Sequence, residues 1–163
     1  MHLICHVAEC VIIKKIKNNM IIMKENKGLY IPLPYAYSKF LFYSSFSMLL
    51  SAIIAIIMND IYITIYFILL FLTSINYWRR PEYGFRRNID LLVVNIGIFT
   101  TLWQACLLKN EFCRFVFLSM ALSCGIFYII EYILIYNKSV TWIIFHMAIH
   151  MYTSLASLFI IFN

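Results

Sequence analysis

Charge is scarce in this chain, and its scarcity excludes most soluble folds. Only 12% of the 163 residues are charged, whereas 64% are hydrophobic. A soluble domain of this length needs a far more polar surface. Five runs approach the ~20 apolar residues that a helix needs to cross a bilayer. These predicted spans are Phe40–Met58, Ile61–Trp78, Ile89–Leu108, Phe115–Tyr136 and Val140–Phe162. We therefore expect an all-α, multi-pass transmembrane helical bundle.

The chain also lacks a cysteine framework. Its five cysteines show neither disulfide nor zinc-finger spacing. Two histidines and two cysteines lie within residues 2–10, but no second ligand pair follows at zinc spacing. We expect no metal site in that segment.

Residues 1–38 are predicted to be a basic, cytoplasmic N-terminal segment, and residues 39–163 to be the transmembrane bundle. Met1–Ile13 is apolar but short for a span. It lacks a basic start and a small-residue cleavage site, so we expect no signal peptide. A lysine-rich stretch follows, and translation from Met20 or Met23 remains an alternative to Met1.

The distribution of lysine and arginine predicts the orientation in the membrane. If the N-terminus is cytoplasmic, all of these residues except Lys109 and Arg114 lie on the cytoplasmic side. Cytoplasmic loops normally carry this excess. We expect an integral membrane protein with its C-terminus on the opposite side. Orientation also accounts for the net charge of +6, so we expect no nucleic-acid partner.

This orientation gathers polar residues of four spans in the cytoplasmic half of the bilayer. At ~1.5 Å per residue, Glu131 and His146 lie roughly 8 Å and 9 Å deep, and His150 roughly 15 Å. Ionisable groups at such depths are costly and mark a functional site by default. The predicted site residues are Ser74, Asp90, Glu131, His146 and His150.

His146 and His150 are four residues apart, so they project from one helix face. Such a pair is half of a transition-metal site. The alternative is two hydrogen-bonded core histidines. Haem fits less well, because bundles usually draw their two axial histidines from different helices.

Ser154 and Ser157 extend the histidine stripe, and polar stripes of this kind normally face neighbouring helices. We expect the same of the Ser119, Ser123 and Glu131 face, and we place Asn76 and Asn95 near this layer.

Residues 78–87 form a basic loop with four arginines. The loop serves to set the topology, or it holds a lipid phosphate headgroup beside the polar residues. The many aromatic residues are explained by interfacial belts and lipid-facing packing.

The order of these polar residues resembles the CREST superfamily of membrane hydrolases, which includes alkaline ceramidases and adiponectin-type receptors. Ser74, Asp90 and the pair His146/His150 match that pattern over roughly residues 40–162. The resemblance implies zinc, held here by His146, His150 and Glu131 or Asp90. It also implies a lipid substrate whose amide or ester carbonyl is attacked by water, with Ser74 and Asp90 positioning the water or the oxyanion.

Two departures separate the chain from this pattern. Trp78 stands where the family has a third zinc-binding histidine, and five spans replace the usual seven. If the site descends from a zinc centre, we expect Trp78 to face the histidine pair. If Trp78 is an interfacial anchor, we expect it to face lipid. A non-catalytic structural or interaction protein is one alternative. A proton or ion pathway through Asp90 and Glu131 is the other.

Overall fold

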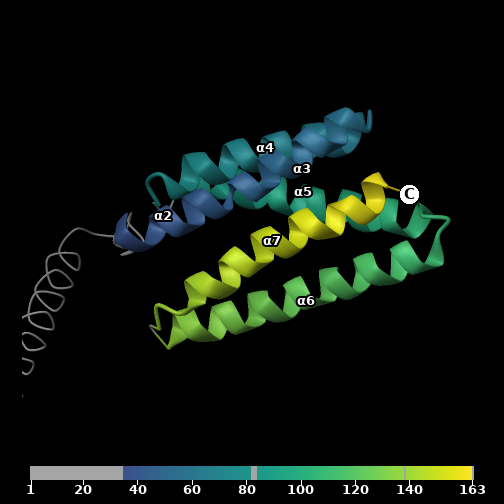
Figure 1. Cartoon of the computed structure of the whole chain (residues 1–163). Helices are drawn as coiled ribbons and strands as arrows, with labels where there is room; N and C mark the ends of the chain where they lie inside the picture. Colours follow the sequence, from purple (N-terminus) through teal and green to yellow (C-terminus); the bar gives the residue numbers. More distant parts are fainter. Residues whose placement is uncertain (1–34, 82–83, 138, 163) are drawn as a thin grey trace, which may run out of the picture.

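The computed structural model describes residues 35–81, 84–137 and 139–162, and nearly all of these residues are helical. The helices are α2 (Tyr35–Ser44), α3 (Phe46–Ile57), α4 (Ile61–Trp78), α5 (Phe85–Leu107), α6 (Glu111–Tyr136) and α7 (Trp142–Ile161) (Figure 1). No strand occurs within the described ranges. Helices α2 and α3 join across Ser45 into one apolar segment, Tyr37–Ile57, so five segments are long and apolar enough to cross a membrane. The predicted all-α, multi-pass architecture is confirmed.

Two helices begin four residues earlier than their predicted spans, because capping residues extend them through charged first turns. The Asn110 side chain accepts hydrogen bonds from the backbone N–H groups of Phe112 and Cys113, at 3.0 Å and 3.3 Å, and caps α6. Gly84 precedes α5 with φ 142°, a conformation that favours glycine. The basic connection is consequently shorter than residues 78–87, since Trp78 ends α4 and Phe85 begins α5.

The first helix within the described residues begins at Tyr35, so the predicted boundary at residue 39 falls inside α2. The remainder of the N-terminal segment lies outside the described residues. This includes the histidine and cysteine pairs of residues 2–10, the lysine-rich stretch and the alternative starts Met20 and Met23.

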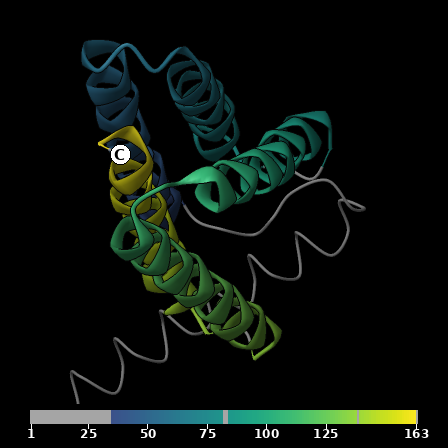
Figure 2. The same cartoon turned by 90° about the vertical axis from the view of Figure 1, so that its right-hand side faces the viewer.

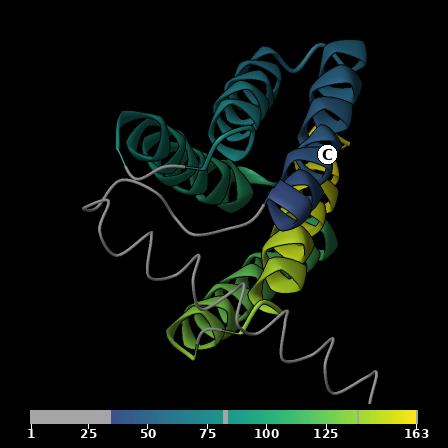
Figure 3. The same ribbon diagram turned by 90° about the vertical axis from the view of Figure 1, so that its left-hand side faces the viewer.

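Helix α7 is the central element of the bundle. It lies along α6 and also contacts α2, α3 and α5, while α4 packs between α3 and α5. Helices α5 and α6 meet at their connecting loop and diverge from there, as views from opposite sides show (Figures 2 and 3). The C-terminal ends of α4 and α6 lie at the same end of the bundle as the N-terminal ends of α5 and α7 (Figure 1).

Small and polar side chains hold these helices together. Lipid tails are as apolar as the helices, so association depends on close packing and interhelical hydrogen bonds. Ala52 and Ala55 of α3 are buried. The Ser51 hydroxyl donates to the backbone oxygen of Ser154 at 3.2 Å, and the Ser154 hydroxyl donates to that of Ser47 at 3.1 Å. These serine hydrogen bonds join α3 to α7 at Ser154, which belongs to the polar stripe of α7.

Candidate functional site

We call the five predicted site residues, Ser74, Asp90, Glu131, His146 and His150, the polar centre. Four of them are buried, and His146 is half-buried. The first pair joins α4 to α5, where the Ser74 hydroxyl donates to Asp90 Oδ1 at 2.9 Å. The neighbouring Thr73 hydroxyl donates to the Leu70 backbone oxygen of its own helix at 3.2 Å. Asp90 is thus held in place by the Ser74 hydroxyl of α4.

The second pair joins α6 to α7. His146 Nδ1 lies 3.0 Å from both carboxylate oxygens of Glu131. The imidazole also lies within electrostatic range of Asp90. Depth and face arguments from the sequence placed Glu131 and His146 in one layer, and the structure brings them into contact.

His150 lies one turn deeper on the same face of α7. Its Nδ1 atom is 2.8 Å from the Ser44 hydroxyl, at the end of α2. The two imidazole ring centroids are 4.8 Å apart, in an edge-to-face arrangement. Both histidines therefore use Nδ1 for their hydrogen bonds to neighbouring helices.

Trp78 packs against His146 and is buried within the bundle. Its ring centroid lies 5.0 Å from that of His146, and the residue is only 4% exposed. Tyr77 and Trp142 flank the indole, at centroid distances of 4.5 Å and 6.3 Å. The indole is therefore buried inside the bundle beside His146.

Some predicted neighbours lie outside this cluster. Asn76, Asn95 and Ser119 are exposed. The Asn95 amide and the Ser119 hydroxyl donate to backbone oxygens of their own helices, at 2.6 Å and 2.9 Å. The expectation that Ser119 faces a neighbouring helix of this chain is therefore wrong, because a serine hydroxyl can be satisfied four residues back on its own helix.

The sequence reasoning missed the contribution of the first span. Ser44 bonds to His150, and the Ser47 hydroxyl donates to the His150 backbone oxygen at 3.3 Å. The spacing of Ser44, Ser47 and Ser51 by three and four residues puts them on one helix face. That spacing indicates a polar face on the first span, although the span as a whole is apolar.

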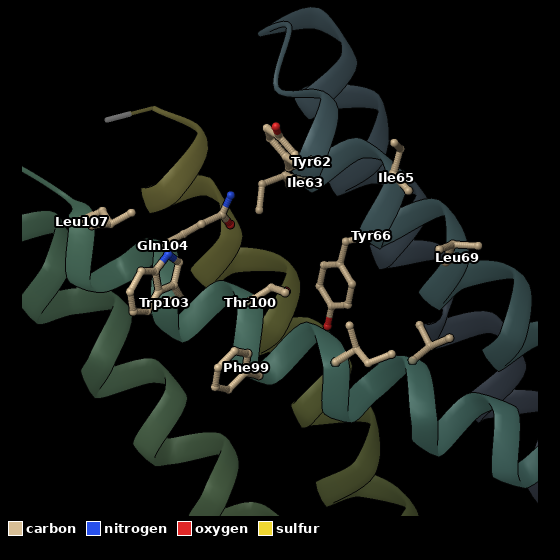
Figure 4. A pocket seen from close by; sticks show the side chains of 12 residues that line it. Tyr62, Ile63, Ile65, Tyr66, Leu69, Phe99, Thr100, Trp103, Gln104 and Leu107 are labelled. Carbon is tan, nitrogen blue, oxygen red and sulfur yellow. The ribbon is translucent and has the colours of Figure 1, made fainter.

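A groove of about 760 Å³ lies between α4 and α5, at the end of the bundle away from the polar centre. The rings of Tyr62, Tyr66 and Trp103 form part of its walls, and Gln104 points into it (Figure 4). No carboxylate, imidazole or thiol is among the described residues that line it. Among these described residues, the polar side-chain groups are hydroxyls, one indole N–H and one amide.

Within the described ranges, no three histidine, cysteine, aspartate or glutamate side chains are grouped so that they could hold an ion. The ligand set predicted from the sequence thus stays a prediction.

No protein-family model, curated protein or solved structure matches this chain. The fold and the site alone define its class. It is a multi-pass, all-α membrane protein with buried ionisable groups gathered at one end of the bundle.

Proposed function

We propose that this chain is a divergent CREST-type membrane hydrolase, which cleaves amide or ester bonds of membrane lipids with the help of a zinc ion. The observation that supports this most is the contact of His146 with both Glu131 and His150, beside the Ser74–Asp90 pair. The chemistry comes from the resemblance of these residues to the family pattern.

The separation of the two histidine rings supports a shared ion in this proposal. Imidazoles bound to one tetrahedral zinc at about 2.0–2.1 Å have ring centroids about 5 Å apart, and 4.8 Å separates those of His146 and His150. Metal-binding histidines usually form a hydrogen bond through the other ring nitrogen to a carboxylate or another polar group. Glu131 and Ser44 supply these partners at Nδ1. In this arrangement Glu131 orients His146, and it becomes a ligand only if it leaves that nitrogen.

The other residues position the reactants and carry the proton. Ser74 donates to Asp90, which fixes its hydroxyl and leaves oxygen lone pairs to accept from a water molecule. Asp90 is a buried carboxylate that can take the proton of the attacking water. Zinc, when bound, would make water nucleophilic near neutral pH and polarise an acyl carbonyl.

A non-catalytic membrane protein is the second candidate, and Trp78 is the observation that favours it. An indole cannot bind zinc, and this one fills space beside His146. Asp90, Glu131 and both histidines all have hydrogen-bond partners within the chain. Such a network suits a structural role as well as a reactive one.

Hydrolysis assays separate the two candidates. Detergent-purified protein with added zinc would be incubated with a panel of ceramides and glycerolipids. We expect fatty-acid release by the wild type, and a loss of at least about 100-fold in Asp90→Asn, since general-base catalysis contributes this much. Ser157→Ala is the matched control, because this buried hydroxyl donates to the Ser154 backbone oxygen within α7. No release from any lipid by the wild type would reject the hydrolase and leave the non-catalytic candidate.

A further inference from the structure

Trp78 carries a buried donor without an acceptor. Its Nε1 atom is, within the part of the chain that the structure describes, the only buried side-chain nitrogen or oxygen that lacks a hydrogen-bond partner. Buried polar groups are nearly always paired, and each exception calls for an explanation. Inside a bilayer the cost is higher, because little water is available to replace the partner.

Both carboxyl groups of the polar centre already have hydrogen-bond partners. Both Glu131 oxygens lie at His146 Nδ1, and the Asp90 carboxyl receives the hydroxyl of Ser74. The indole lies edge-to-face with the His146 ring, so the unpaired donor lies beside the polar centre. Trp78 also follows Ser74 by four residues and shares its helix face.

We propose that Trp78 Nε1–H binds the acyl carbonyl oxygen of a lipid ester or amide at the polar centre. An indole N–H only donates, so its missing partner must accept. An acyl carbonyl accepts two hydrogen bonds and offers none, which matches this neutral donor. Trp78 is then a substrate-binding residue. At the position where the family pattern has a metal-binding histidine, this chain has a donor that binds the carbonyl oxygen of the lipid. The inference rests on the proposed lipid substrate.

Two lipids that differ in one carbonyl oxygen test this directly. The probes are monooleoylglycerol and its 1-O-oleyl ether analogue, titrated into the detergent-purified full chain, with a chelator present to keep the ester intact. We expect the wild type to bind the ester about tenfold more tightly, the value of one hydrogen bond. Trp78→Phe keeps an aromatic ring but removes the donor, so the preference should vanish. Trp142→Phe is the matched control, since Trp142 also packs on His146 at 6.1 Å and should keep the preference.

A second readout needs no variant that might misfold. With ¹⁵N-labelled tryptophan, the three indoles of the chain give separate N–H resonances. The ester should shift the Trp78 resonance downfield, and the ether should not. Two results would overturn the inference: an equal preference for the ester in the wild type and Trp78→Phe, or a Trp78 resonance that does not shift when the ester is added. Either result would mean that this donor is hydrogen-bonded only to an ordered water. Failure of both lipids to bind would instead overturn the proposed lipid substrate, and the inference with it.

Discussion

At the scale of single residues, the polar centre shows how a membrane protein accommodates ionisable side chains. Asp90 accepts a hydrogen bond from the Ser74 hydroxyl, Glu131 contacts the imidazole of His146, and His150 contacts the hydroxyl of Ser44. Each of these contacts crosses between helices, so each also fixes a helix pair. Breaking one partner should therefore loosen the bundle as well as alter the site.

Glu131→Gln tests this coupling. The amide keeps the shape of the side chain but removes the charge facing His146, and a hydrogen bond to a charged group contributes about 1–3 kcal/mol. We expect the free energy of unfolding in detergent to fall by that amount. Glu111→Gln is the matched control, because the Glu111 side chain is 87% exposed and its carboxylate oxygen lies 3.5 Å from Arg114 Nη2. Such exposed pairs contribute little. An equal effect of both changes would contradict the structural importance of the Glu131–His146 pair.

Sequence reasoning predicted the contact between α6 and α7 but not the whole environment of His150. Helix geometry alone places Glu131 and His146 at one depth, because both spans have clear ends. It does not say which neighbour faces His150, since that depends on how α2 and α3 cross α7. Ser44 and Ser47 were overlooked for this reason, although their spacing marks one face.

At the scale of helices, the α4–α5 pair depends on a glycine. A Cβ atom at Gly97 would overlap the Tyr66 ring, whereas one at Gly125 would meet nothing within 4 Å. Gly97 thus lets the ring lie directly against the α5 backbone. The same pair carries the Ser74–Asp90 contact, so its packing also sets the geometry of the polar centre.

Gly97→Ala and Gly125→Ala should therefore have opposite effects. At Gly97 the added methyl group displaces Tyr66, and overpacking of this kind costs about 1–3 kcal/mol. At Gly125 alanine meets open space and favours the helix by up to about 1 kcal/mol. Thermal unfolding in detergent measures both. Adding Tyr66→Ala to Gly97→Ala should remove the clash; a double variant no better than its two single changes combined would contradict this account.

Helix boundaries were predicted to within a few residues, except where caps extend a helix past its apolar run. Hydropathy marks the residues that lie in hydrocarbon, whereas Asn110 and Gly84 set where the backbone begins to coil. The start of the apolar run and the start of the helix differ where the first turn contains charged residues, such as Arg86 and Arg87 in α5.

At the scale of the whole molecule, five membrane-crossing segments place the α4–α5 connection and the α5–α6 connection at opposite ends of the bundle. The orientation itself stays a prediction from charge. Arg79 and Arg80 lie at the end that holds the polar centre, and Lys109 at the other. The polar centre should therefore face the cytoplasm.

Cysteine labelling checks this orientation. In a variant free of its five native cysteines, a cysteine at Arg80 should react with a membrane-impermeant reagent only from the cytoplasmic side. A cysteine at Asn110 should react only from the opposite side. Reaction of both from one side would contradict the five-span arrangement.

Metal analysis of the purified protein tests the proposal that the histidine pair of α7 holds a zinc ion. We expect bound zinc in the wild type, its loss in His150→Ala, and its retention in the control His6→Ala, which changes a histidine outside the described residues. Trp78→His should tighten binding by adding a third nitrogen ligand beside His146. Zinc content that is absent from the wild type, or unchanged by His150→Ala and by Trp78→His, would contradict the account.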